Sequence, residues 1–201
     1  MLKIAVLISG GGTNLQAVLD AQHSGMLHSG EVVLVISNRK AAYGLERAKL
    51  SGIETAVLSN AMQPDAHKRD EQLLALLQSR GIDVVLLAGY LGILGERVLC
   101  AYPSRIINVH PALIPAFCGM GMYGLRVHEA ALARGVKLTG ATAHLVNGEV
   151  DGGPILLQKA VDVLADDTPE TLQLRVMQEA EWQLLPLAAE MICSQIINQE
   201  D

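Results

Sequence analysis

Short apolar runs alternate with amphipathic stretches through the first half of the chain. The runs have the length of strands and are rich in Val, Ile and Leu, which predicts strands buried on both faces of a sheet. The stretches between them carry apolar residues at helical spacing, which predicts helices. The predicted strands are Leu2–Ile8, Glu31–Ser37, Thr55–Leu58, Asp83–Ala88 and Arg105–Val109, and the predicted helices are Asn14–Ser24, Tyr43–Leu50 and Ala66–Ser79.

This alternation predicts an α/β fold built on a mostly parallel, twisted sheet with helices on both faces. Right-handed crossovers join consecutive strands in such folds, and ligands bind beyond the carboxyl ends of the strands. That rule marks four segments as candidates for a binding site before any motif is considered. They are Ser9–Asn14, Ser37–Arg39, Gly89–Leu94 and Asn108–Pro115.

The pattern changes after Pro115. The next segment, Ala116–Gly124, has three glycines and no periodicity, so we expect a loop. Two long apolar runs farther on flank a turn-rich segment, and such a reversal predicts an antiparallel strand pair. The elements predicted here are a helix at Arg126–Arg134, strands at Lys137–Val146 and Gly153–Val163, and a helix over Thr168–Ser194 that Thr168 caps and Pro169 opens. No repeat or linker interrupts the pattern, so we expect a single Rossmann-like domain over residues 1–201.

Composition narrows the class of protein. The formal net charge is −6 and no basic tract occurs, so we expect small-molecule substrates and no nucleic-acid partner. No apolar segment reaches the length of a membrane span, and the first run is too short for a signal peptide. The three cysteines, Cys100, Cys118 and Cys193, form no Cys-x-x-Cys motif. They read as free thiols in a reducing compartment, so we expect a cytoplasmic protein without membrane contact.

The glycine-rich loop Ser9–Asn14 follows a predicted strand and opens a predicted helix. Its glycines let the backbone approach an anion, and the N–H groups and dipole of a helix N-terminus favour negative charge. The spacing matches neither a Walker loop nor a dinucleotide fingerprint, and no acidic residue closes the second strand at Ser37–Arg39. The loop therefore favours a monophosphate over a dinucleotide. A tight turn without a ligand is the alternative, and the loop alone leaves both open.

Asn108, His110 and Asp151 form a candidate catalytic group. The alternation of a strand puts Asn108 and His110 on one side, where an amide can donate to an oxyanion and an imidazole can move protons. A nearby Asp151 carboxylate would raise the pKa of His110 and favour its imidazolium form. A structural histidine and an ordinary Asp-Gly-Gly turn are the alternatives. A metal site of His110, His128 and His144 lacks ligand spacing, so we expect no metal. The residues alone predict an α/β enzyme of acyl transfer on a phosphorylated substrate.

Three motifs resemble those of one enzyme family. Residues 8–16, Ile-Ser-Gly-Gly-Gly-Thr-Asn-Leu-Gln, resemble the phosphate loop of the phosphoribosylglycinamide formyltransferases. Asn108–Pro115 resembles the central motif of the wider folate-dependent formyltransferase superfamily, and Gly140–Val146 followed by Asp151–Ile155 resembles its second motif. The resemblance covers nearly the whole chain in order. It implies transfer of a formyl group from 10-formyltetrahydrofolate to the amine of glycinamide ribonucleotide, a step of purine synthesis.

The resemblance also implies roles for individual residues. Asn108, His110 and Asp151 match the catalytic trio. The positions that match residues binding glycinamide ribonucleotide are Gly12, Thr13, Asn14, Gln178 and Glu181; without the resemblance, the last two read as a solvated helix face. The positions that match residues binding folate are Leu91, Gly92, Ile93, Leu94, Asn147, Gly148, Glu149 and Val150, together with Asn108 and Asp151. Residues 1–109 would then form the nucleotide-phosphate half, and residues 110–201 the folate-binding and catalytic half.

The chain departs from the family pattern in three places. The Ala116–Gly124 segment is longer than in the shortest family versions and lacks a Lys. Gly92 stands where some members have Arg. An Arg that precedes the helix at Ala66–Ser79 in some members has no clear counterpart, although Lys68 or Arg69 could replace it. These departures concern folate affinity and not the class of reaction.

Other activities stay open. A 10-formyltetrahydrofolate hydrolase would use the same trio with water as nucleophile, but such enzymes usually carry an N-terminal regulatory domain, and this chain starts at its first strand. A methionyl-tRNA formyltransferase would need a basic surface and a C-terminal domain. A non-catalytic protein that binds a phosphorylated metabolite would not need Asn108, His110 and Asp151 together. The pattern leaves the oligomeric state open between monomer and homodimer.

Overall fold

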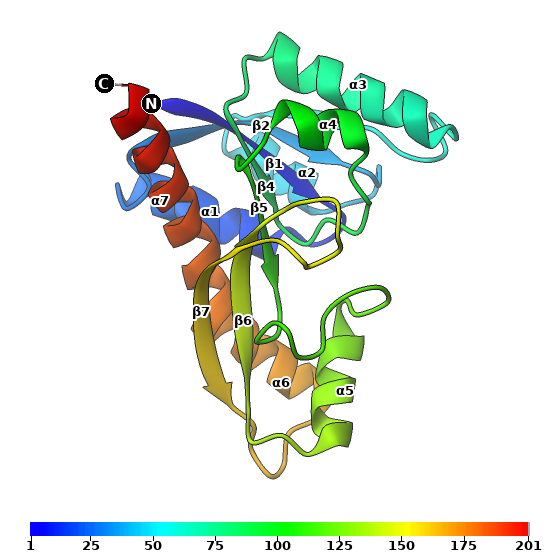
Figure 1. The fold of residues 1–201 in the computed structure, drawn as a ribbon, viewed down its shortest axis with the longest axis vertical. Coiled ribbons are helices and arrows are strands. Elements are labelled where there is room, and N and C mark those ends of the chain that lie inside the picture. The colour runs from blue at the N-terminus through cyan, green and yellow to red at the C-terminus, as the bar shows by residue number, and fades with distance from the viewer. Residues whose placement is uncertain (201) are drawn as a thin grey trace.

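One sheet of seven strands runs through the protein in the order β3-β2-β1-β4-β5-β6-β7 (Figure 1). The structure is a computed structural model that describes residues 1–200. The strands are β1 (Leu2–Ile8), β2 (Gly30–Ser37), β3 (Glu54–Val57), β4 (Val84–Leu87), β5 (Ile106–His110), β6 (Leu138–Leu145) and β7 (Ile155–Asp162). Strands β1 to β5 pair in parallel, and β6 and β7 pair antiparallel, which confirms the predicted sheet.

Helices cover both faces of this sheet, as predicted. They are α1 (Thr13–His23), α2 (Gly44–Leu50), α3 (Ala66–Ser79), α4 (Glu96–Ala101), α5 (Leu125–Arg134), α6 (Pro169–Val176), the π-helix η1 (Met177–Glu181) and α7 (Trp182–Glu200). Ile4, Val6 and Ile8 of β1 pack in one core with α1, α2, α6 and α7. Ala5 and Leu7 pack in a second core with α3 and α4. The alternation of strand side chains thus fills two separate apolar layers.

Helix α4 is an element that the sequence pattern did not predict. It has six residues and begins after Gly95, whose lack of a side chain leaves it without a cap of its own. The carboxylate of Asp70 on α3 supplies the cap, because it accepts hydrogen bonds from the backbone N–H groups of Gly95, at 3.1 Å, and Arg97, at 2.9 Å. A cap from another helix leaves no local signal.

The predicted helix over Thr168–Ser194 is interrupted. Its start is confirmed, because the Thr168 side chain accepts from the Thr171 N–H and the two residues form a capping box. The helical path then changes to the π-helix over Met177–Glu181 before α7 continues to residue 200. Pro186 lies inside α7, close to the end of the π-helix. Because proline has no N–H, the carbonyl four residues earlier receives no helical hydrogen bond from it.

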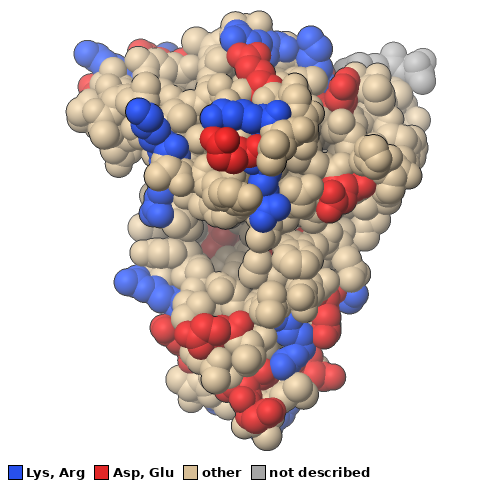
Figure 2. All heavy atoms as spheres, turned by 180° about the vertical axis from the view of Figure 1, so that it is seen from behind, with Lys and Arg blue, Asp and Glu red and all other residues tan. Residues whose placement is uncertain are grey.

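The surface is mixed in charge. On the face shown in Figure 2, basic and acidic side chains lie beside one another and do not gather into one patch of a single sign. Within residues 1–200, the helices do not combine the length and apolar character that crossing a membrane requires. The cysteines Cys100, Cys118 and Cys193 are free thiols.

Candidate active site

The candidate segments meet at the carboxyl edge of the sheet, where the strand order reverses between β1 and β4. The loops after these two strands are joined directly, since the Leu91 N–H donates to the buried Ser9 hydroxyl at 2.8 Å. The Asn108–Pro115 segment begins on the neighbouring strand β5. The fold therefore brings the glycine loop, the Leu91 segment and the predicted catalytic strand to one crevice, as expected for a sheet of this type.

The glycine loop is hydrogen-bonded to α2 through its backbone carbonyls. Gly12 has a left-handed backbone, with φ +72°, at the start of α1. The Gly10 carbonyl accepts from the Gly44 N–H at 3.1 Å, and the Gly11 carbonyl accepts from Arg47 Nε at 2.9 Å. With these carbonyls bound to α2, the N–H groups of the first turn of α1 are free to face an anion. Sequence reasoning singled out neither Gly44 nor Arg47.

Asn14 and Glu181 form a buried polar pair beside the loop. Asn14 Nδ2 donates to Glu181 Oε2 at 2.7 Å, and Asn14 Oδ1 has no hydrogen-bond partner among residues 1–200. Burial raises the pKa of Glu181 to about 7, although the Asn14 amide opposes this. Gln178, on the same π-helix, is exposed. Interpreting this segment as a solvated face is therefore wrong for Glu181, which the π-helix turns inward toward α1.

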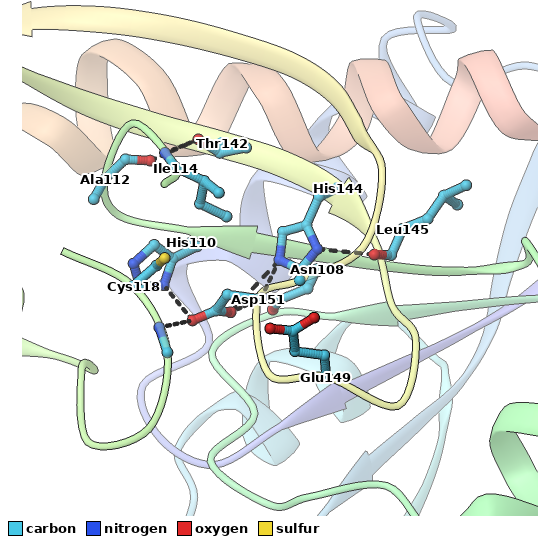
Figure 3. A network of polar contacts seen from close by, with 12 residues as sticks. Asn108, His110, Ala112, Ile114, Cys118, Thr142, His144, Leu145, Glu149 and Asp151 are labelled. Atoms are coloured by element: carbon cyan, nitrogen blue, oxygen red, sulfur yellow. Dashed lines mark hydrogen bonds and ion pairs between the residues drawn. The ribbon is translucent and has the colours of Figure 1, made fainter. Parts of the chain in front are cut away.

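The three predicted catalytic side chains converge (Figure 3). Asn108 and His110 lie on β5, and Asp151 comes from the β6–β7 connection with a left-handed φ of +56°. His110 Nδ1 lies 3.5 Å from Asp151 Oδ2, and Asn108 Nδ2 lies 3.5 Å from Asp151 Oδ1. The side chains of His110 and Asp151 are only 5% and 8% exposed. An amide donor, an imidazole and a carboxylate thus share one small, sheltered volume.

His144 on β6 is a fourth member of this cluster. Sequence reasoning placed it in the second motif and considered it as a metal ligand, but did not include it in the catalytic group. Its Nε2 lies 3.1 Å from Asn108 Nδ2, and its Nδ1 lies 2.9 Å from the Leu145 carbonyl oxygen. Because Nδ1 faces a carbonyl oxygen, that nitrogen carries a proton and donates to Leu145. His144 Nε2 is also 3.6 Å from Asp151 Oδ1. The antiparallel register that pairs Asn108 with His144 brings it into the cluster, and no local pattern in the sequence signals that register.

The three histidines considered as metal ligands are not grouped as a metal-binding cluster within residues 1–200. Both ring nitrogens of His144 are engaged by Asn108 and Leu145, and the buried His128 has no hydrogen-bond partner on either nitrogen within the described chain. No group of three or more His, Cys, Asp or Glu side chains in residues 1–200 is arranged to hold a metal ion.

The electrostatics of His110 differ from the prediction. Its Nε2 lies 2.9 Å from the Phe117 carbonyl oxygen and its Nδ1 faces Asp151, so two acceptors flank the ring and only the imidazolium can donate to both. Burial nevertheless lowers the pKa of His110 below its ordinary 6.5; the Asp151 charge and the Phe117 carbonyl oppose burial but do not outweigh it. The expectation of a raised His110 pKa is therefore wrong, because the cost of burying the charged ring exceeds the attraction.

Asp151 stays ionised at neutral pH. Burial raises the pKa of Asp151, but donors on His144 and Gly119 and the charges of the neighbouring histidines outweigh burial and hold that pKa below its ordinary 3.8. The Gly119 N–H donates to Asp151 Oδ2 at 2.9 Å. A carboxylate is thus available beside His110 over the physiological pH range.

Asp151→Asn is expected to lower the pKa of His110 further, because the change removes the charge that favours the imidazolium while the ring stays buried. The measurement is an NMR titration of the His110 imidazole in both proteins. Glu149→Gln is the control, since it removes a carboxylate from the same loop that has no ion pair with His110. A His110 pKa that is unchanged or higher in Asp151→Asn would mean that the carboxylate does not act on this ring.

A cavity of about 140 Å³ opens next to the cluster. Nearly all positions predicted to bind folate line it: Gly92, Ile93, Leu94, Asn108, Asn147, Gly148, Glu149, Val150 and Asp151. Leu91 lies in an adjoining open groove of about 840 Å³, which Arg69 and Arg97 also line. Arg69 Nη1 donates to the carbonyls of Gln63 and Pro64, both at 2.8 Å, so this Arg also holds the segment before α3. Apolar walls and a few polar groups of this kind are typical of a small-molecule site.

Comparison with known proteins gives one consistent result. A family model described as formyl transferase matches residues 2–189. The chain is 42% identical to the chloroplastic phosphoribosylglycinamide formyltransferase of Arabidopsis thaliana over 98% of its length and 67% of that protein, and 41% identical to the Haemophilus influenzae phosphoribosylglycinamide formyltransferase over 93% and 85%. A crystal structure of glycinamide ribonucleotide transformylase 1 from Symbiobacterium toebii matches with a TM-score of 0.90 and 44% identity, covering 97% of this chain and 89% of that one.

Proposed function

The chain belongs to the formyl transferase family, and from that membership we propose that it transfers the formyl group of 10-formyltetrahydrofolate to the amine of 5′-phosphoribosylglycinamide. The products are formyl-glycinamide ribonucleotide and tetrahydrofolate, a one-carbon transfer within purine biosynthesis. The observation that supports this most directly is the convergence of Asn108, His110 and Asp151 beside a cavity lined by the positions predicted to bind folate (Figure 3). The three free thiols fit a cytoplasmic enzyme.

The reaction is a direct transfer between two bound substrates. The neutral amine of the nucleotide attacks the formyl carbon, which gives a tetrahedral oxyanion. Asn108 donates to that oxygen, and so does His110 in its imidazolium form, which the lowered pKa makes the minor form at neutral pH. The bond from the carbon to folate N10 then breaks, the amine loses one proton and N10 gains one, with His110 and Asp151 as the groups that carry the proton. Holding both substrates in line supplies much of the rate, since effective molarities of about 10⁵ M or more are reached by aligned pairs.

Glycinamide ribonucleotide would bind at the N-terminal end of α1. Backbone N–H groups of Gly12, Thr13 and Asn14 bind the 5′-phosphate, and the helix dipole adds to the attraction. The buried Glu181 carboxyl and the unpartnered Asn14 Oδ1 are acceptors for the ribose hydroxyls, with the exposed Gln178 at the rim. The folate head group would occupy the cavity between the Leu91–Leu94 segment and the Asn147–Asp151 loop.

The test is to incubate purified protein with 10-formyltetrahydrofolate, with and without glycinamide ribonucleotide, and to follow tetrahydrofolate, formate and formyl-glycinamide ribonucleotide. We expect tetrahydrofolate and formylated nucleotide to appear together, only when both substrates are present. Formate released without the nucleotide would identify a hydrolase. Binding of the nucleotide without any turnover would identify a protein that only binds the metabolite.

Gly12→Val is expected to weaken glycinamide ribonucleotide about tenfold or more while leaving the folate affinity nearly unchanged. A Cβ at this position would lie 2.6 Å from Gly44 Cα, and φ is +72°, so the loop must shift where the phosphate binds. Calorimetric Kd values for each ligand give the comparison. Gly25→Val is the matched control, because Gly25 has a similar φ of +79° in open space outside the site. Equal weakening of both ligands by Gly12→Val would show that the loop is a general structural element.

A further inference from the structure

The Ala116–Gly124 loop, which the proposed reaction leaves without a role, reaches into the catalytic cluster with its backbone. The Phe117 carbonyl oxygen lies 2.9 Å from His110 Nε2, and the Gly119 N–H donates to Asp151 Oδ2 at 2.9 Å. Both contacts come from one short turn between β5 and α5. The loop thus touches the imidazole with an acceptor and the carboxylate with a donor.

The Gly119 contact is the short one among the polar contacts of Asp151. Its distance of 2.9 Å lies in the range of a charge-assisted hydrogen bond. By contrast, the side chains of His110 and Asn108 lie at 3.5 Å and that of His144 at 3.6 Å. At such distances these three groups attract the carboxylate but do not fix its direction. The backbone amide therefore sets the orientation in which Asp151 faces His110.

The turn has a backbone shape that suits this task. Phe117 and Gly119 both have left-handed backbones, with φ of +51° and +90°. The turn is tied on both sides, because Cys118 Sγ donates to the Pro115 carbonyl at 3.2 Å and the Met122 N–H donates to the Gly119 carbonyl at 3.1 Å. A side chain on Gly119 would meet no atom within 4 Å, so its φ, rather than space, calls for glycine.

We propose that Gly119 is a positioning residue for formyl transfer. Its amide holds the Asp151 carboxylate against His110, while the Phe117 carbonyl holds the opposite edge of the same ring. This inference rests on the proposed function, since it concerns how the trio is aligned for that reaction. The Ala116–Gly124 loop then contributes to catalysis through its backbone and not through a side chain.

The test compares Gly119→Ala with Gly121→Ala. The two glycines lie in the same loop, have φ of +90° and +86°, and both have open space where a Cβ would stand. Alanine strains the backbone equally at both positions, but only the Gly119 N–H donates a hydrogen bond to Asp151. We expect kcat of Gly119→Ala to fall about ten- to a hundredfold, because small misalignments of reacting groups have effects of this size. Gly121→Ala should keep kcat close to that of the unmodified protein.

Two further readouts separate positioning from general damage. Gly119→Ala made in an Asp151→Asn background should have little additional effect on kcat, because the amide acts through that carboxylate. On the acid side, the pH at which kcat falls should rise in Gly119→Ala but not in Gly121→Ala, since moving the Gly119 amide away from the carboxylate raises the pKa of Asp151. The titratable groups that interact with Asp151, namely His110, His144 and Cys118, are the same in both variants.

Equal kcat and equal pH profiles in the two alanine variants, or an undiminished effect of Gly119→Ala in the Asp151→Asn background, would overturn the inference. If Gly119→Ala does not fold, hydrogen exchange of the Gly119 amide decides. It should be protected in the unmodified protein and much less so in Asp151→Ala, which has no acceptor oxygen, and equal protection would refute the contact. Absence of formyl transfer in the unmodified protein would instead overturn the proposed function.

Discussion

Asp151→Asn and His110→Ala are each expected to lower kcat by about 10²–10³-fold while the Kd of glycinamide ribonucleotide stays nearly unchanged. Each change removes a group that stabilises charge in the transition state, and losses of this kind have that magnitude. Both side chains lie in the cluster beside the cavity, whereas the nucleotide phosphate is assigned to the start of α1. Single-turnover kinetics and calorimetry on each variant separate the chemical step from binding.

Asp162→Asn and His23→Ala are the controls for these two substitutions. They make the same chemical changes at exposed positions on β7 and α1, and kcat should stay within about twofold, as is usual for surface changes. A kcat near that of the unmodified protein in either Asp151→Asn or His110→Ala would remove that residue from the mechanism. The effects of the two substitutions should not add in the double variant, because the side chains act as one unit.

Glu181→Gln is expected to make the ligand-free protein more stable, by about 3 kcal/mol at pH 8. The pKa of Glu181 is raised from 4.5 to about 7 in the folded state. Between these values the unfolded chain is ionised while the folded carboxyl still holds its proton, so stability falls as pH rises, by about 1.4 kcal/mol per pH unit. Above about pH 7 the penalty is complete, and the neutral amide avoids it. Below pH 4.5 both forms are neutral and the gain disappears.

Urea denaturation at pH 5 and pH 8 measures this effect. The stability gain should be under about 1 kcal/mol at pH 5. Glu179→Gln, an exposed neighbour on the same π-helix, should show no such dependence on pH. A gain that is equal at the two pH values would contradict the assignment to the Glu181 carboxyl.

The same variant should bind glycinamide ribonucleotide about tenfold or more weakly, since a charged acceptor for the ribose is lost. Stability and binding would then change in opposite directions, as at many functional sites.

Features that depend on neighbours in the chain could be predicted from the sequence. Strand β1 was predicted at its observed bounds, because a run of strand length buried on both faces has few alternatives. Helix α3 was also predicted at its observed bounds, since its cap is local: the Asp65 carboxylate accepts from the N–H groups of His67 and Lys68. The parallel sheet followed from the order of these elements.

Features that depend on contacts between distant segments could not be predicted. Helix α4 begins where Asp70, 25 residues earlier, caps it. Glu181 is buried because a π-helix turns it toward Asn14, 167 residues away. His144 joins the cluster through the register of β5 and β6. The lowered pKa of His110 reflects how deeply the ring is buried, and no motif reports the depth of burial. The roles that the resemblance implies for these residues stay predictions, and the electrostatics of the cluster could be described only from the structure.

The contact between Gly12 and Gly44 has a consequence for anyone who would redesign this protein. Each glycine stands where a side chain on the other would press against backbone, with a Cβ on Gly12 at 2.6 Å from Gly44 Cα and a Cβ on Gly44 at 3.1 Å from Gly12 Cα. The glycine loop and α2 therefore pack as one unit, although Gly12 and Gly44 lie 32 positions apart along the chain. A new ligand specificity cannot be introduced into the loop alone. The loop and α2 must be kept together or replaced together.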